Sequence, residues 1–523
     1  MRFTKISAVL TALGLLVGLA ACSAGDAVTD PAQTTAAPAT VEADEQQIPG
    51  ITLSDEGVTT DAEGVYTANN IIYYEEGRDE SYGDGEADDA HSAEEAAAHT
   101  VVHITKPGTY RVTGKLSAGQ LFVDLGEDAE SDPEAVVNLI LDGADITCTV
   151  APAVFFYRVY ECADAEAYTL TPDLSGAGAV VTLADGSTNT VNGSYVARIY
   201  KEGTTKKLHK YDGAFYSKMS MRIEGTDGQL TINAENEGLD SELHLEINGG
   251  VIEITSQNDG INTNEDGLSV TTVNGGTLTI NAGLGSEGDG IDSNGALVIN
   301  GGTVFTTANP QTGDGGIDAD LDIYLNGGRV IACGSRNDTS SSDSTQQFLE
   351  LSFAKNVEVG SVVALYDGET EVFSMTATRE FSSLTVSVPE LENGVSYRLT
   401  VDGVTQQHGG AMKGGMAGLG DPPTPPDGST IDDPSPVTPP ELPAGASEGQ
   451  KPPAMPDGET PPDPLDGETP PERPDGEAPD GKDPAGMPND AMRPNEGSED
   501  TEISTEFTLS ADRHSFYNVC DAE

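Results

Sequence analysis

The sequence contains no tryptophan and only 25 lysine and arginine residues, against 88 aspartate and glutamate residues. Its formal net charge of −63 excludes nucleic acid and anionic membrane surfaces as attractive partners, because both would repel the chain. Hydrophobic residues make up only 36% of the chain, whereas 61 residues are glycine and 31 are proline. This composition excludes a large helical core. It favours divalent cations as partners, because they relieve the repulsion between clustered carboxylates.

Long hydrophobic runs are also nearly absent. The run Ile6 to Ala20 is shorter than a membrane span, and no other stretch approaches the ~20 apolar residues that cross a bilayer. Basic residues precede the run and Leu19-Ala20-Ala21-Cys22 ends it, which is typical of a signal peptide. The ending resembles a lipobox, so we predict a lipoprotein signal peptide over residues 1–22, acylation of Cys22, and a mature chain at the extracellular face of the cell membrane. Ordinary signal cleavage with an incidental Cys22 is the alternative.

Cysteine is scarce, and four cysteines remain once Cys22 is set aside. An even number in an oxidising compartment indicates disulfides. We predict that Cys148 pairs with Cys162 and that Cys333 pairs with Cys520, which would tie the C-terminus to the rest of the domain. Four unpaired, mostly buried thiols are the alternative.

Two low-complexity segments flank the region in which we expect ordered structure. Residues 23–49 have no apolar period and read as a disordered tether. Residues 406–500 are rich in glycine and methionine and then in proline, with 22 of the 31 prolines between 421 and 500, so we expect neither helix nor sheet there. Residues 501–523 regain apolar character and predict a strand that returns to the domain.

A 26-residue repeat determines the predicted fold. Asn-Gly-Gly recurs at this spacing, and each copy is followed by a short alternating strand such as Thr277 to Ile280. Strands this short cannot bury a face alone, but stacked copies can pair with the copies above and below. The chain lacks a leucine-rich spine and a nine-residue glycine period. The four copies begin at Asn248, Asn274, Asn300 and Asn326.

The repeat therefore predicts an all-β fold, a right-handed parallel β-helix over residues 50–348. At ~26 residues per coil, the segment from about 100 to 345 would hold roughly nine coils. Residues 349–405 contain short alternating runs joined by turns such as Asp367-Gly368, and predict a small antiparallel β cap.

A second motif recurs once per coil, with the pattern acid, glycine, aliphatic, Asp or Asn, small, acid or amide. Asp289 to Asn294 is one example. Stacking would place equivalent positions ~4.8 Å apart, with the aliphatic residue inward and the oxygens in ladders of like charge. Ca²⁺ bridging these oxygens would turn repulsion into binding. A ladder that only accepts hydrogen bonds from turn amides is the alternative. The predicted calcium ligands are Asp240, Glu242, Asp259, Asn262, Asn264, Asp289, Asp292, Asn294, Asp318 and Asp320.

These motifs also carry a family resemblance. The sequence from Gly108 to Val112, through Leu141 to Thr147 and Leu183 to Asn189, and on to the repeated coils, resembles a family of secreted bacterial carbohydrate-binding proteins with a calcium-loaded, pectate-lyase-like β-helix. The resemblance covers about 50–405. It implies polysaccharide binding without established catalysis, and calcium held by the acidic turn residues. This chain departs from the pattern in its inserts at 161–176 and 198–210.

Catalysis is the less favoured interpretation of the repeat. A β-helix lyase needs a lysine or arginine base beside its calcium, yet no lysine occurs between Lys218 and Lys355. The regular coils retain Arg222, Arg329, Arg336 and His244. We therefore predict a protein that is not an enzyme, with a pectate-lyase-like polysaccharide lyase as a further alternative.

The candidate sugar surface is the segment 157–216, which is rich in tyrosine and contains a cluster of basic residues. Tyrosine rings stack on pyranose faces, while lysine and arginine attract uronate carboxylates. A solvated insertion with half-buried tyrosines is the alternative. The predicted contact residues are Tyr195, Arg198, Tyr200, Lys206, Lys207 and Tyr211.

Together these features predict a surface-anchored, calcium-stabilised, monomeric protein that binds polysaccharide, with a preference for acidic polymers. It would meet the membrane through its lipid anchor alone and would not bind nucleic acid. A structural or adhesive surface protein, with the coils as a rigid spacer, is the alternative.

Overall fold

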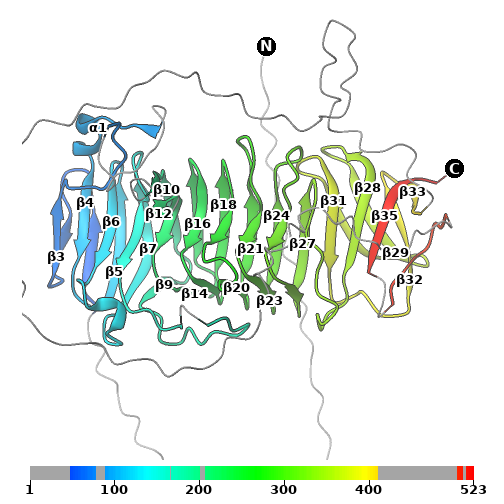
Figure 1. Cartoon of the computed structure of the whole chain (residues 1–523), viewed down its shortest axis with the longest axis horizontal. Helices are drawn as coiled ribbons and strands as arrows, with labels where there is room; N and C mark the ends of the chain where they lie inside the picture. Colours follow the sequence, from blue (N-terminus) through cyan, green and yellow to red (C-terminus); the bar gives the residue numbers. More distant parts are fainter. Residues whose placement is uncertain are drawn as a thin grey trace, which may run out of the picture. The chain divides into compact units, whose positions relative to one another are not determined.

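The computed structural model describes residues 48–77, 89–164, 167–200, 207–409, 503–510 and 514–522, with the backbone alone at 198–200 and 207–210. This part of the chain is nearly all β, with a single short α-helix, α1 (Ala93–Ala97) (Figure 1). Its helices include none long and apolar enough to cross a membrane. The predicted signal peptide with Cys22, the tether as far as Gln47, and most of the proline-rich segment lie outside the described residues.

Parallel strands form three stacks, in which each strand pairs with its counterpart from the next repeat. The first stack holds β4 (Thr100–Ile104), β6 (Gly119–Asp124), β8 (Val154–Arg158), β13 (Gly213–Ser217), β16 (Glu237–Ser241), β19 (Ile261–Thr263), β22 (Ile291–Ser293) and β25 (Ile317–Ala319). The second holds β9 (Ala179–Leu183), β14 (Met221–Gly225), β17 (His244–Ile247), β20 (Val270–Val273), β23 (Ala296–Ile299) and β26 (Ile323–Leu325). The third holds β10 (Thr188–Gly193), β15 (Gln229–Ala234), β18 (Val251–Ser256), β21 (Thr277–Asn281), β24 (Thr303–Thr307) and β27 (Arg329–Gly334).

Two long strands join the second and third stacks at their N-terminal end. β7 (Val137–Thr147) pairs with β9 through its first half and with β10 through its second. β5 (Gly108–Leu116) pairs with β7 along both halves and with β1 (Gly50–Leu53) on its other edge. β2 (Thr59–Thr60) and β3 (Val65–Ala68) are antiparallel to their neighbours at this end.

The Asn-Gly-Gly copies stack into a ladder of side-chain amides. Asn274 Nδ2 donates to Asn248 Oδ1 at 2.9 Å, Asn300 Nδ2 donates to Asn274 Oδ1 at 2.9 Å, and Asn326 Nδ2 donates to Asn300 Oδ1 at 3.1 Å. The second glycine of each copy turns the chain with a positive φ, +85° at Gly276. A Cβ there would lie 2.6 Å from the carbonyl oxygen of Gly250, so the close stacking requires glycine.

The interior between the stacks is a continuous apolar core. The aliphatic residue of each acidic motif points into it, and the four in-register side chains Leu239, Ile261, Ile291 and Ile317 are fully buried. Each such side chain contributes about 1.5–3 kcal/mol by leaving water. The predicted inward column of aliphatic residues is therefore present.

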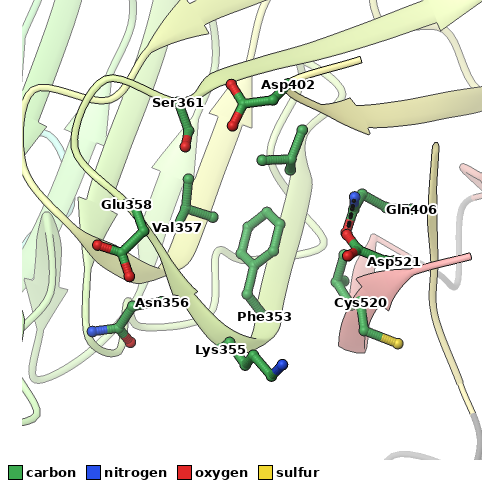
Figure 2. Close-up of a pocket in the computed structure, with 12 residues that line it drawn as sticks. Phe353, Lys355, Asn356, Val357, Glu358, Ser361, Asp402, Gln406, Cys520 and Asp521 are labelled. Carbon is green, nitrogen blue, oxygen red and sulfur yellow. Dashed lines mark hydrogen bonds between the residues drawn. The ribbon is translucent and has the colours of Figure 1, made fainter. Parts of the chain in front are cut away.

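After β27 the chain forms a largely antiparallel cap. Its strands are β28 (Leu349–Val357), β29 (Val362–Asp367), β30 (Thr370–Thr376), β31 (Phe381–Ser387), β32 (Ser396–Val401), β33 (Val404–Gln407), β34 (Phe507–Thr508) and β35 (Ser515–Asp521). β31 pairs with β27 and β28, and so joins the cap to the third stack. β35 lies parallel to β28 and antiparallel to β33, and these three strands meet around a pocket (Figure 2).

The predicted disulfides are wrong in this structure, because all four described cysteines are free. Cys333 in β27 is separated from β35 by β31 and β28, which places Cys520 about 14 Å away or more, beyond the reach of a disulfide. Cys148 follows β7 and Cys162 lies beyond β8, with that extended strand between them in the chain. Burial raises the pKa of Cys162 to about 11 and that of Cys148 to about 12, so both are protonated thiols.

Candidate functional site

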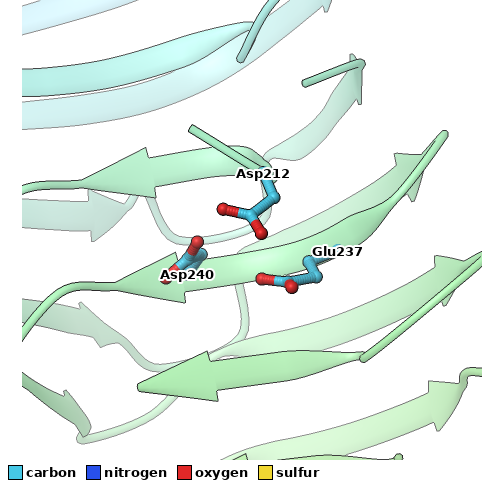
Figure 3. A group of neighbouring side chains, drawn as sticks. All are labelled: Asp212, Glu237 and Asp240. Carbon is cyan, nitrogen blue, oxygen red and sulfur yellow. The ribbon is translucent and has the colours of Figure 1, made fainter. Parts of the chain in front are cut away.

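Three buried carboxylates converge at the first stack. Asp212 lies just before β13, while Glu237 and Asp240 lie at the start and near the end of β16 (Figure 3). Among the described residues they are the one set of three acidic, histidine or cysteine side chains whose ligand atoms all lie within 4.8 Å of one another. All three are almost completely buried. Three buried carboxylates at this separation repel one another strongly unless a cation or protons neutralise them.

Asp240 begins an in-register column of oxygen-bearing side chains along the first stack. It pairs with Asn262, Asn262 with Asp292, and Asp292 with Asp318. Asn262 is 5% exposed, and its Oδ1 accepts no hydrogen bond from the residues that the structure describes. A buried amide oxygen without a donor is costly, and it is a hard oxygen of the kind that Ca²⁺ binds.

Charge crowding also marks the distal coils. Burial, together with Asp259 and Asp318, raises the pKa of Asp289 to about 9. Burial and a shared hydrogen bond with Asp338 raise the pKa of Asp318 to about 7. Burial and the charge of Asp266 raise the pKa of Asp320. These coils therefore hold more carboxylates than they can keep ionised without a counter-ion.

The other predicted ligands have hydrogen-bonding roles. Asp259 Oδ1 accepts the amide of Asp289 at 2.7 Å, and Asp289 Oδ1 accepts the amide of Gly315 at 2.5 Å. Asn264 Nδ2 donates to Asp240 Oδ1 at 2.8 Å. The alternative of a turn-capping ladder therefore operates at Asp259 and Asp289, each through one oxygen. Two further predicted ligands are also engaged: Glu242 accepts the hydroxyl of Tyr216, and Asn294 Nδ2 donates to the carbonyl of Asn264 and to Asp266.

The sequence motif did not single out three acids of this region, Glu237, Asp212 and Asp338. Glu237 occupies the first acid position of the motif, and stands in register before Asp259 and Asp289. Asp212 precedes Gly213 as Glu237 precedes Gly238, so the acid-glycine pair was the available signal. Asp338 has no such signal, because it comes from an irregular loop after β27.

Residues 98–378 match the model of the carbohydrate-binding domain-containing protein family. That range contains the three carboxylates and the whole acidic column. The chain belongs to this family. A family protein of Acetivibrio thermocellus is 30% identical over 154 residues, which are 29% of this chain and 44% of that protein, so the match spans less than half of the relative. A polysaccharide lyase-like protein from C. thermocellum, solved as a gadolinium derivative, is 22% identical over 54% of this chain and 93% of its own, with a TM-score of 0.33.

The predicted sugar segment of this family member forms an antiparallel hairpin of β11 (Val196–Tyr200) and β12 (Lys207–Tyr211). The backbones of Arg198, Tyr200 and Lys207 lie on it, whereas Lys206 and the side chains of the other three lie outside the described residues. Tyr195, half-buried just before the hairpin, donates its hydroxyl to Asp89 Oδ1 at 2.6 Å.

Tyr211 is a correction to the predicted sugar contacts, because only 4% of it is exposed. Its ring packs against Phe155 and Tyr216, with centroids 4.8 and 5.5 Å apart. Burial raises the pKa of its hydroxyl. Tyr211 belongs to the aromatic core because burial of a ring of this size stabilises the fold more than exposure at the end of a hairpin would.

Three of the four basic residues of the regular coils have structural partners, and they are Arg222, Arg329 and His244. Arg222 pairs with Glu224 at 3.2 Å, and Arg329 pairs with Glu390 at 2.7 Å. His244 is buried at the start of β17, and its Nδ1 accepts the amide of Val270 at 3.0 Å. Burial lowers the pKa of His244 to about 4, so its ring is neutral in the folded protein.

His244 is expected to make the protein less stable as the pH falls from about 6.5 to about 4. In this window the unfolded chain binds a proton on His244 and the folded chain does not, which favours unfolding by up to about 3 kcal/mol. Urea unfolding across this range should show a shallower pH dependence for His244→Gln, which cannot titrate. Parallel curves for the two proteins would contradict the buried neutral ring.

Proposed function

We propose that this protein binds polysaccharide through a calcium-stabilised, right-handed parallel β-helix that a lipid anchor on Cys22 holds at the extracellular face of the cell membrane. Family membership over 98–378 supports carbohydrate binding. The three parallel stacks and their in-register ladders support the β-helix. The observation that carries the calcium proposal is the buried set of three carboxylates, Asp212, Glu237 and Asp240.

The residues of this site fit Ca²⁺. The ion takes six to eight hard oxygens at 2.3–2.6 Å. Asp212, Glu237 and Asp240 would supply carboxylate oxygens, and Asn262 has a buried amide oxygen without a donor. When bound, Ca²⁺ would neutralise the carboxylates of Asp212, which precedes β13, and of Glu237 and Asp240 on β16. The acids Asp292 and Asp318, further along the column, would hold calcium between later coils by the same chemistry.

The proposed sugar surface lies beside this site in the chain. Asp212 directly follows β12, so the hairpin that carries Arg198, Tyr200 and Lys207 ends on a proposed calcium ligand. Holding Asp212 in place would also hold the end of the hairpin. We therefore propose that calcium binding supports sugar binding, with arginine and lysine of the hairpin attracting uronate carboxylates.

Retention of the protein on immobilised polygalacturonate is expected to depend on calcium. EDTA should release it, and restored calcium should return it. Because polygalacturonate itself gels with calcium, the full-length protein should be compared with Arg198→Ala/Lys207→Ala, which is expected to bind about tenfold more weakly in the same calcium. A structural or adhesive protein would be retained by no polysaccharide, and equal retention of the two proteins would overturn the hairpin as the contact surface.

We also propose that the protein does not cleave its polysaccharide. The engagement of Arg222, Arg329 and His244 in the coils supports this, because a lyase needs a basic group free to take the proton beside the uronate carboxylate. Incubation with polygalacturonate and calcium is expected to give no rise in the ultraviolet absorbance of unsaturated uronates. A calcium-dependent rise that Arg336→Ala abolishes would show a lyase.

A further inference from the structure

The cap contains a pocket of about 450 Å³ where β28, β33 and β35 meet the turns after β28 and β32 (Figure 2). This volume lies within the range of small-ligand sites. The ring of Phe353 lies at the centre of the pocket, with Val357 beside it, and Val401 also lines the pocket. Phe353 is only half-buried, and it packs edge-on against Phe381 with ring centroids 5.9 Å apart. The floor is therefore an aromatic ring held in place by a core neighbour.

Polar groups form the rim of this floor. Asp402 has a left-handed backbone, φ +49°, and its Oδ1 accepts the amide of Val362 at 2.8 Å. Across Phe353 from Glu358, the buried Gln406 donates from Nε2 to Asp521 Oδ1 at 3.0 Å (Figure 2). Asn356 near the end of β28 and Glu358 just after it are both exposed and line the pocket. Two of the rim carboxylates are thus oriented by the protein before any ligand binds, which lowers the entropy lost on binding.

We propose that this cap pocket binds a neutral pyranose unit of a polysaccharide. Phe353 would lie under the apolar face of the sugar, and the carboxylates and amides of the rim would form hydrogen bonds with its hydroxyl groups. The ring C–H groups of a pyranose pack on an aromatic face, and carboxylates are strong acceptors for hydroxyl donors. This proposal extends the proposed polysaccharide binding to a second site, which lies in the cap rather than on the β11–β12 hairpin.

The charge of the pocket determines the class of sugar. Three carboxylates line it, on Glu358, Asp402 and Asp521, against the single ammonium group of Lys355. A uronate, sulfate or phosphate group would meet net repulsion there. A neutral sugar carries no charge, so the negative potential of the pocket does not weaken its binding. The cap pocket and the basic hairpin would therefore bind different parts of a mixed polysaccharide.

Calorimetry with the full-length protein tests the proposal, using cellohexaose, mannohexaose, xylohexaose and hexagalacturonate as probes. At least one neutral oligosaccharide is expected to bind, with the affinity lowered about tenfold by Phe353→Ala and by Asn356→Ala. Asn356 is exposed, so its loss should leave the fold intact. Val359→Ala is the matched control, since Val359 is exposed in the turn directly after β28 but does not line the pocket. Unchanged affinity in both pocket variants, or no binding of any neutral probe, would overturn the proposal.

Charge removal provides a second test. The triple variant Glu358→Gln/Asp402→Asn/Asp521→Asn is expected to bind hexagalacturonate more tightly than the wild-type pocket does.

Alkylation of Cys520 provides a third test, because this residue lines the pocket. In a Cys22→Ser/Cys162→Ser background, its alkylation should slow when the neutral probe is saturating. Full-rate alkylation at saturation would place the probe elsewhere. EDTA should release polygalacturonate without changing this protection, so failure of the calcium-dependent function and failure of the cap pocket give different results.

Discussion

Removing calcium is expected to lower the melting temperature of the protein by about 8 °C or more. An ion that binds only the folded state at a thousand times its Kd adds about 4 kcal/mol, and each kcal/mol corresponds to about 2 °C for a domain of this size. The large effect follows from burial. Asp212, Glu237 and Asp240 are held within 4.8 Å of one another inside the fold, so loss of the ion leaves three crowded carboxylates with raised free energy.

Asp240→Asn separates calcium binding from general instability. In calcium the variant should melt lower than wild type, because the site loses a charged ligand. In EDTA it should melt higher than wild type, because one of three repelling charges is gone. Glu253→Gln, on the exposed face of β18, is the matched control and should change neither value. No effect of EDTA, together with no calcium in elemental analysis of the purified protein, would rule out the proposed site.

The regular part of the fold was predictable because one residue spacing fixes it. Four Asn-Gly-Gly copies at equal spacing imply that each asparagine lies over the next. The structure contains the resulting hydrogen bonds between side-chain amides, at 2.9 to 3.1 Å. The aliphatic column from Leu239 to Ile317 followed from the same argument, because stacking brings equivalent positions into register. The parallel β architecture could therefore be derived from the sequence alone.

The candidate site was only partly predictable, because it depends on contacts outside the repeat. The motif gave Asp240 and the column through Asp318, but Asp212 follows the insert at 198–210, which shares no spacing with the coils. Tyr211 was assigned to the surface by composition, whereas packing against Phe155 decides its place. The disulfides failed for a related reason. Pairing Cys333 with Cys520 assumed that the returning strand would lie next to β27, and β31 and β28 lie between them.

Deleting residues 503–523 is expected to unfold the cap. β34 pairs with β32, while β35 pairs with β28 and β33, so the deletion exposes strands on both sides. It also removes four side chains that are fully buried in the cap core, each contributing about 1.5–3 kcal/mol, or about 6–12 kcal/mol in total. That loss is as large as the whole stability of a typical domain. The four side chains are Phe507, Leu509, Phe516 and Val519.

Neighbouring aromatic residues on β35 provide the matched pair for this prediction. Phe516→Ala should lower stability by about 3–5 kcal/mol, because its ring is 1% exposed in the cap core, whereas Tyr517→Ala should change it little, because Tyr517 is 41% exposed. The C-terminal segment with β34 and β35 should also rebind when it is supplied as a separate peptide. His408 and Ser504 exchange two backbone hydrogen bonds, at 2.8 and 3.0 Å, so the chain leaves and re-enters the cap at one point. A synthetic peptide of residues 503–523 should therefore restore the melting temperature of a protein that ends at Gly409, and a Phe516→Ala peptide should do so only at higher concentration. If the truncated protein melts like wild type without any peptide, the C-terminal strands are dispensable and the cap core lies elsewhere.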